Sequence, residues 1–130
     1  MRVALPASLT KRSHASLVRA VLVACNRLPG VDLYAVDVGG AKRKHGTPGV
    51  SDIIGYVSVC SLCWIFKKVR RGKACFDSAL TLPVFVAYEI KVGRDKLRPA
   101  QRAFLERVNA AGGIGLEIRD VMSAVKALGG

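Results

Sequence analysis

The stretch that most constrains the fold is LTLPVFVAYEIKV, residues 80 to 92. Its residues are apolar on both faces of a strand until Glu89 is reached. A strand of this kind is covered on both sides, because side chains alternate between the two faces of a sheet. The sequence therefore predicts that residues 80 to 92 form a central strand in a sheet flanked by helices.

Two charged residues stand near the end of this strand. Glu89 and Lys91 share one face, whereas Tyr88 and Ile90 lie on the other. Burying a charge is costly unless it is paired or coordinated. We therefore expect a compensating group beside Glu89 and Lys91. The alternative is an ordinary ion pair on an edge strand, which would contribute little to stability.

Helical spacing, alternation and turn residues predict six further elements around the central strand. They are a helix capped by Ser13 and running to 28, strands at 31–38 and 51–62, a helix from Pro99 to about Ala111, a strand at 114–118, and a final helix capped by Asp120. The order is αβββαβα. No internal repeat or linker interrupts it, so we expect residues 1–130 to form a single α/β domain with a mixed sheet.

Gln101 occupies an unusual position for a polar side chain. With Phe104, Leu105 and Val108 it follows the spacing of one helical stripe, which should face the core. A buried amide needs hydrogen-bond partners. The partner is either a strand end, in a purely structural role, or the same place that Glu89 and Lys91 face.

Asp52 opens the second predicted strand directly after the turn sequence TPGVSD. If this strand pairs with the third, Asp52 can approach Glu89. Two adjacent carboxylates repel each other, and a divalent cation removes that repulsion. Oxygen ligands of this type suit Mg²⁺ or Mn²⁺. The residues thus indicate a metal site in which Lys91 lies beside a bound water or a phosphate.

The charge of the chain indicates a polyanionic partner. Lys and Arg number 21 against 9 Asp and Glu, which gives a formal net charge of +12. Nucleic acid is the first candidate, and a membrane surface is second because no long basic amphipathic helix supports it. Two basic segments are the candidate nucleic-acid contacts, although either can be an ordinary solvated segment. They comprise Lys42, Arg43, Lys44 and His45, and Lys67, Lys68, Arg70, Arg71 and Lys73.

The cysteines leave two interpretations open. Cys60 and Cys63 form a CxxC pair and Cys75 follows, but a fourth zinc ligand is hard to find. We therefore predict thiols without structural zinc, with a zinc site as the alternative.

The chain also shows no secretory signal pattern and no apolar run of the roughly 18 residues that a membrane span needs. A cytoplasmic, non-secreted protein is expected.

Three segments together resemble a known family. They are GVSDIIG at 49–55, YEIKVG at 88–93 and LRPAQRAFLERVNAAGG at 97–113, which cover much of the predicted core. They are similar to the VRR-NUC (virus-type replication-repair) nucleases of the PD-(D/E)xK superfamily, which are common in phages and in DNA-repair enzymes. The resemblance implies a restriction-endonuclease-like fold and a Mg²⁺-dependent DNA endonuclease that hydrolyses phosphodiester bonds.

The resemblance also implies a role for each site residue. Asp52 and Glu89 would bind Mg²⁺, or Mn²⁺ in its place, together with the backbone carbonyl of Ile90. Lys91 would orient the attacking water and stabilise the phosphate, and Gln101 would hold the geometry of the site. Small members of the family resemble Holliday-junction resolvases, so branched DNA and a homodimer with two active sites are expected.

Two departures from the family pattern bear on activity. The first predicted helix, SHASLVRAVLVACNRL, contains no acid where the family commonly carries a glutamate, and His14 or Ser16 stands near that position. The connection between the second and third strands is longer and more basic than in compact members. A catalytically degenerate DNA-binding protein on the same fold is therefore one alternative, and a small basic RNA-binding protein is another.

Overall fold

The computed structural model describes residues 13–36, 49–60 and 81–130, which form one mixed four-stranded sheet and three helices. The strands are β1 (Val31–Ala35), β2 (Ile53–Cys60), β3 (Thr81–Ile90) and β4 (Ile114–Ile118), and the helices are α2 (His14–Asn26), α4 (Pro99–Ala110) and α5 (Val121–Ala127). The strand order is β1-β2-β3-β4, with β3 and β4 parallel and the other pairs antiparallel. The α/β class and the mixed sheet are confirmed.

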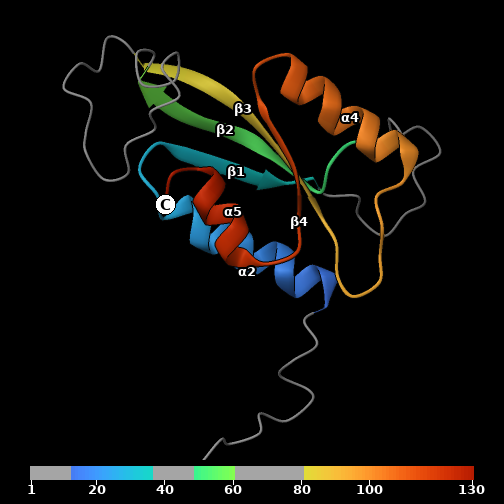
Figure 1. Cartoon of the computed structure of the whole chain (residues 1–130). Coiled ribbons are helices and arrows are strands. Elements are labelled where there is room, and N and C mark those ends of the chain that lie inside the picture. Colours follow the sequence, from blue (N-terminus) through green and yellow to red (C-terminus); the bar gives the residue numbers. More distant parts are fainter. Residues whose placement is uncertain (1–12, 37–48, 61–80) are drawn as a thin grey trace, which may run out of the picture.

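The central position of β3 is also confirmed, since it pairs with β2 on one side and with β4 on the other. Helices α2 and α5 lie on one face of the sheet and α4 lies on the opposite face (Figure 1). The predicted strand at 80–92 ends earlier than expected, at Ile90, although Lys91 N–H still donates to Ile118 O at 3.0 Å. Two residues further on, Gly93 has a positive φ of 57°, which turns the chain away from the sheet.

The face toward α2 and α5 holds the main hydrophobic core. Val86, Tyr88 and Ile90 of β3 are fully buried there, with Val21 of α2 and Ile118 of β4. The Tyr88 hydroxyl donates to the backbone carbonyl of Ala124 in α5 at 2.8 Å. This polar atom is therefore satisfied inside an otherwise apolar layer.

The face toward α4 holds a smaller core. Ala87 of β3 packs there against Leu105 and Val108 of α4. Gly115 of β4 allows the helix to approach closely, because a Cβ at this position would lie 2.6 Å from the Leu105 carbonyl oxygen. Helix α4 therefore sits over β3 and β4, where the site residues of the sequence analysis come together.

The predicted helix ends agree closely with the structure. Ser13 and Asp120 are the N-caps of α2 and α5, and their side chains accept from the N–H groups of Ser16 and Ser123. Strands β1 and β2 are shorter than the predicted 31–38 and 51–62. Asp52 immediately precedes β2, and the predicted strand ends beyond 36 and 60 lie outside the described residues. None of the helices described is long and apolar enough to cross a membrane.

Candidate functional site

The pairing of β2 with β3 brings Asp52 to Glu89. In the antiparallel register Ile53 lies opposite Tyr88, so Asp52, one residue before β2, falls beside Glu89. The Asp52 carboxylate is fixed in place because its Oδ2 accepts the backbone N–H of Ile90 at 2.9 Å. The predicted approach of these two carboxylates is therefore confirmed.

Glu89 is almost entirely buried, with only 2% of its surface exposed. Its Oε1 accepts from Gln101 Nε2 at 2.6 Å and lies 3.3 Å from Lys91 Nζ. Its Oε2 is buried and has no hydrogen-bond partner in the described part of the chain. When Glu89 is protonated it can share its proton with Asp52, but the ionised form leaves this buried oxygen without a donor. That is costly and makes the atom a candidate ligand position.

The electrostatics of Glu89 follow from this environment. Burial is the largest cause that raises its pKa from 4.5 to about 7, and the nearby charge of Asp52 raises it further. Lys91 acts in the opposite direction but does not outweigh these effects. A carboxyl group with such a pKa is stabilised in its charged form by any additional cation at the site.

Each carboxylate is also held by a side chain from the first turn of a helix. His14 Nε2 of α2 lies 3.1 Å from Asp52 Oδ2, and Gln101 of α4 binds Glu89. The positive ends of two helix dipoles therefore approach the site from opposite faces of the sheet. Such an arrangement favours anions, including phosphate, close to the carboxylates.

Gln101 serves the helix and the site together. Its Oε1 accepts the backbone N–H of Arg98 at 2.8 Å, which caps α4, while its Nε2 binds Glu89. Gln101 is only half-buried, and the structural and the site interpretation of its amide apply to different atoms of the same side chain. The cap also fixes the amide orientation, because the oxygen must face Arg98.

The remaining predicted site residues are distributed as follows. Lys91 is at the site, and Ile90 reaches it through the N–H that binds Asp52. The predicted nucleic-acid contacts lie outside the described residues, as do Cys63 and Cys75 of the predicted thiols. They are Lys42, Arg43, Lys44, His45, Lys67, Lys68, Arg70, Arg71 and Lys73.

The donor set fits a hard divalent cation. Within the described ranges, no cluster of three or more His, Cys, Asp or Glu side chains could hold a metal ion by itself. Mg²⁺, however, is commonly bound through only one or two carboxylates and otherwise through water and substrate phosphate. Asp52 and Glu89 supply two carboxylates, and the unpartnered Glu89 Oε2 is an available ligand atom.

One group of polar and aromatic residues was not predicted from the sequence. Asp32, Tyr34 and Tyr56 lie together on the α4 face of β1 and β2, where both tyrosine hydroxyls donate to Asp32 Oδ2 at 2.6 and 3.2 Å. The alternation of VDLYA places Asp32 and Tyr34 on one face, which was a usable signal. The partner Tyr56 could be found only from the strand register.

Comparisons of the chain with protein-family models, with curated proteins and with solved structures each returned no match. The geometry of the site is therefore the basis for assigning a function.

Proposed function

We propose that this protein is a Mg²⁺-dependent DNA endonuclease of the type that the VRR-NUC resemblance implies. The observation that carries the proposal is the Asp52–Glu89 pair, in which a buried Glu89 oxygen lacks a partner beside a second carboxylate. Lysine and glutamine side chains hold the other oxygen. This combination of two carboxylates and one lysine suits phosphodiester hydrolysis.

Each residue has a distinct task in this proposal. Asp52 and Glu89 would hold the cation, which supplies an activated water and offsets the charge that builds on the phosphate. The ammonium group of Lys91 would bind the attacking water or a phosphate oxygen, since it lies beside Glu89 with 12% of its side chain exposed. Gln101 would position Glu89 through its amide, because its oxygen is already committed to the cap of α4.

A second function is supported by His14. The residue of α2 that contacts Asp52 is this histidine and not an acid. The site therefore holds one carboxylate fewer than the resemblance would imply. Weaker cation binding would follow. The protein would then bind DNA through its net charge of +12 without cleaving it.

Cleavage assays on DNA of different structure test the proposal. Purified protein is incubated with plasmid, flap and four-way-junction DNA in Mg²⁺, Mn²⁺ or EDTA. Cleavage in either metal, its absence in EDTA and its loss in Asp52→Asn are expected. Glu106→Gln is the matched control. Glu106 is an exposed glutamate of α4, and its substitution removes the same charge at a position away from the site.

The results separate the two functions. If the wild type binds DNA but never cleaves it in Mg²⁺ or Mn²⁺, the binding-only function replaces the nuclease. If cleavage persists in Asp52→Asn at the wild-type rate, the site has been assigned to the wrong residues.

A further inference from the structure

The α4 face of the sheet carries aromatic side chains that are open to solvent. Tyr34, Tyr56 and Phe85 are 57%, 42% and 44% exposed. Helix α4 packs mainly over β3 and β4, and Ile54 of β2 adjoins its small core, whereas Tyr34 and Tyr56 stay open to solvent. Three large rings exposed on one sheet face of a small domain need a physical explanation.

The strand register aligns these residues across the sheet. Asp32 is the partner of Tyr56, and Tyr56 is the partner of Phe85, so the three form one row across β1, β2 and β3. Tyr34 lies on the same face, two residues further along β1. The hydrogen bonds of both tyrosines to Asp32 hold the two rings in place.

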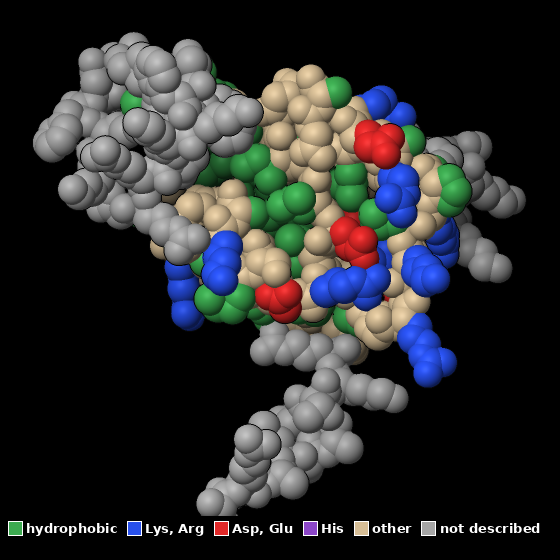
Figure 2. Space-filling view, in the orientation of Figure 1, with side chains coloured by type: hydrophobic (Ala, Val, Ile, Leu, Met, Phe, Trp, Pro, Cys, Tyr) green, Lys and Arg blue, Asp and Glu red, His purple; other side chains and the backbone are tan. Residues whose placement is uncertain are grey.

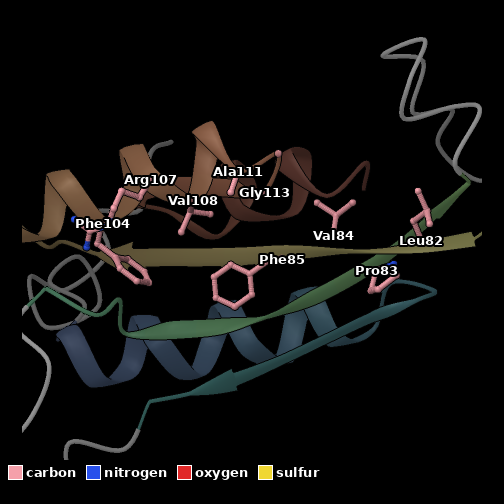
Figure 3. A pocket seen from close by; sticks show the side chains of 10 residues that line it. Leu82, Pro83, Val84, Phe85, Phe104, Arg107, Val108, Ala111 and Gly113 are labelled. Atoms are coloured by element: carbon pink, nitrogen blue, oxygen red, sulfur yellow. The ribbon is translucent and has the colours of Figure 1, made fainter.

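Helix α4 borders this row with a further aromatic ring and a cation. Phe85, Phe104 and Arg107 line a hollow of about 570 Å³ between β3 and the C-terminal half of α4. The Arg107 guanidinium lies 6.0 Å from the centre of the Phe104 ring. Figure 3 shows the rings of Phe85 and Phe104 on the same side of the β3 ribbon. A nucleobase fits a hollow of this size and lining.

The aromatic residues continue toward the candidate catalytic site. Phe85 and Glu89 share one face of β3 four residues apart, which corresponds to about 13 Å along the strand. On α4, Gln101, Phe104 and Arg107 follow at successive turns, so the helix borders the same path. The space-filling view shows hydrophobic side chains beside α4, with Lys, Arg and acidic side chains on the helix and near it (Figure 2).

We propose that Tyr34, Tyr56, Phe85, Phe104 and Arg107 form an aromatic platform on which unpaired bases of a nucleic-acid strand stack. The substrate would then carry a single-stranded segment beside the phosphodiester bond that is cleaved. This inference rests on the proposed function, because the cleavage site defines in which direction the bound strand runs from the platform. The distance from Phe85 to Glu89 corresponds to about four stacked nucleotides, or fewer in an extended strand.

The chemistry of the platform favours bases over other occupants. Aromatic rings and an arginine plane stack on any base, and the net charge of +12 attracts the strand that carries it. The Asp32 carboxylate repels phosphate groups. The bases of the strand, and not its sugar-phosphate backbone, should therefore contact β1. A second copy of this chain would be the occupant of a purely apolar face, but this face contains a carboxylate, two hydroxyls and a guanidinium.

Binding in EDTA tests the platform separately from cleavage. The affinity of the full chain is measured for a single-stranded oligonucleotide and for an oligonucleotide of equal length and charge whose sugars are abasic. We expect the wild type to prefer the strand with bases by at least about tenfold. Tyr56→Ala and Phe85→Ala should each remove most of this preference, whereas Tyr56→Phe, which keeps the ring, should retain it.

Met122→Ala is the matched control, because it shortens an exposed apolar side chain of α5 on the opposite face. Equal wild-type affinity for the two strands, or an undiminished preference in both alanine variants, overturns the platform. A dimer that dissociates in Tyr56→Ala, without any preference for bases, assigns the face to a second copy. Cleavage without base preference overturns the platform alone, and base preference without cleavage in Mg²⁺ or Mn²⁺ overturns the nuclease alone.

Discussion

Tyr88 and Glu89 are neighbours in β3, both are buried, and they point to opposite faces of the sheet. The Tyr88 hydroxyl is satisfied by the carbonyl of Ala124, whereas Glu89 Oε2 has no partner among the residues described. The α2 and α5 face therefore behaves as a conventional core. The α4 face retains a buried carboxyl oxygen without a partner among the residues described, and this is the face that carries the candidate site.

The two faces of the sheet also differ in how far helices cover them. Two helices close one face over a large hydrophobic cluster, while α4 packs mainly over β3 and β4 on the other. The exposed rings and the carboxylates of Asp52 and Glu89 occupy this second face together. The alternation of side chains along single strands thus places the main core and the candidate site on opposite faces of the sheet.

The largest expected effect is on DNA cleavage, which a substitution on the α4 face should abolish and a substitution on the α2 and α5 face should leave unchanged. Glu89→Gln should reduce metal-dependent DNA cleavage by about a thousandfold or more, because it removes a cation ligand while keeping the shape of the side chain. DNA affinity in EDTA should stay equal or rise slightly, since a negative charge is lost. Tyr88→Phe should cleave at a rate close to wild type. Wild-type cleavage by Glu89→Gln would contradict the assignment of this strand.

The second expected effect is a pH dependence of stability in metal-free protein. Folded Glu89 has a pKa of about 7 against an ordinary value of 4.5, so the folded state binds more protons between these values. Stability should therefore fall as pH rises from about 4.5 to above 7, by at most about 3 kcal/mol.

Urea unfolding in EDTA across this pH range measures the effect. Glu89→Gln should lose most of the decrease, and saturating Mg²⁺ should reduce it in the wild type because a bound cation stabilises the ionised carboxylate. Glu106→Gln is again the control. A decrease of equal size in Glu89→Gln would assign the pH dependence to other groups.

The third expected effect concerns the closed face. Tyr88→Phe removes the hydrogen bond to Ala124 and leaves its buried carbonyl without that donor, which should cost about 1 to 2 kcal/mol. Glu89→Gln in EDTA at pH 8 should change stability in the opposite direction, because it removes an ionised group that burial and Asp52 destabilise. Thermal or urea unfolding of both variants measures whether each substitution lowers or raises the free energy of unfolding. If both variants are destabilised, Glu89 is a structural ion-pair partner of Lys91.

Much of this contrast was accessible from the sequence. The apolar run at 80–92 predicted the central strand, and the strand pattern predicted that Asp52 approaches Glu89 if the second and third strands pair. The helical stripe left Gln101 either at this site or at a strand end. These predictions succeeded because period-two and helical alternation assign a side chain to a face without knowledge of long-range packing. The unpartnered Glu89 oxygen could not be foreseen, since satisfaction of a polar atom depends on distances between elements.

The aromatic platform shows where sequence reasoning reaches its limit. Tyr56 and Phe85 are partners across β2 and β3, yet they are 29 positions apart in the chain. The pairing register decides this contact, and a shift by one residue would turn one ring to the other face. The contact of His14 with Asp52 likewise depends on where α2 crosses the end of the sheet.

The smallest expected effect tests the site at that contact. His14→Glu would place a third carboxylate near Asp52 Oδ2, which the His14 ring approaches to 3.1 Å. Apparent affinity for Mg²⁺, measured as the cation-dependent rise in unfolding temperature, should increase several-fold, because another negative oxygen ligand favours a divalent cation. Without metal the variant should be slightly less stable, since three carboxylates then repel one another. His14→Gln, which adds no charge, is the control and should leave Mg²⁺ affinity near that of the wild type. Unchanged or weaker Mg²⁺ affinity in His14→Glu would mean that no cation binds beside Asp52, and the binding-only function would then be preferred.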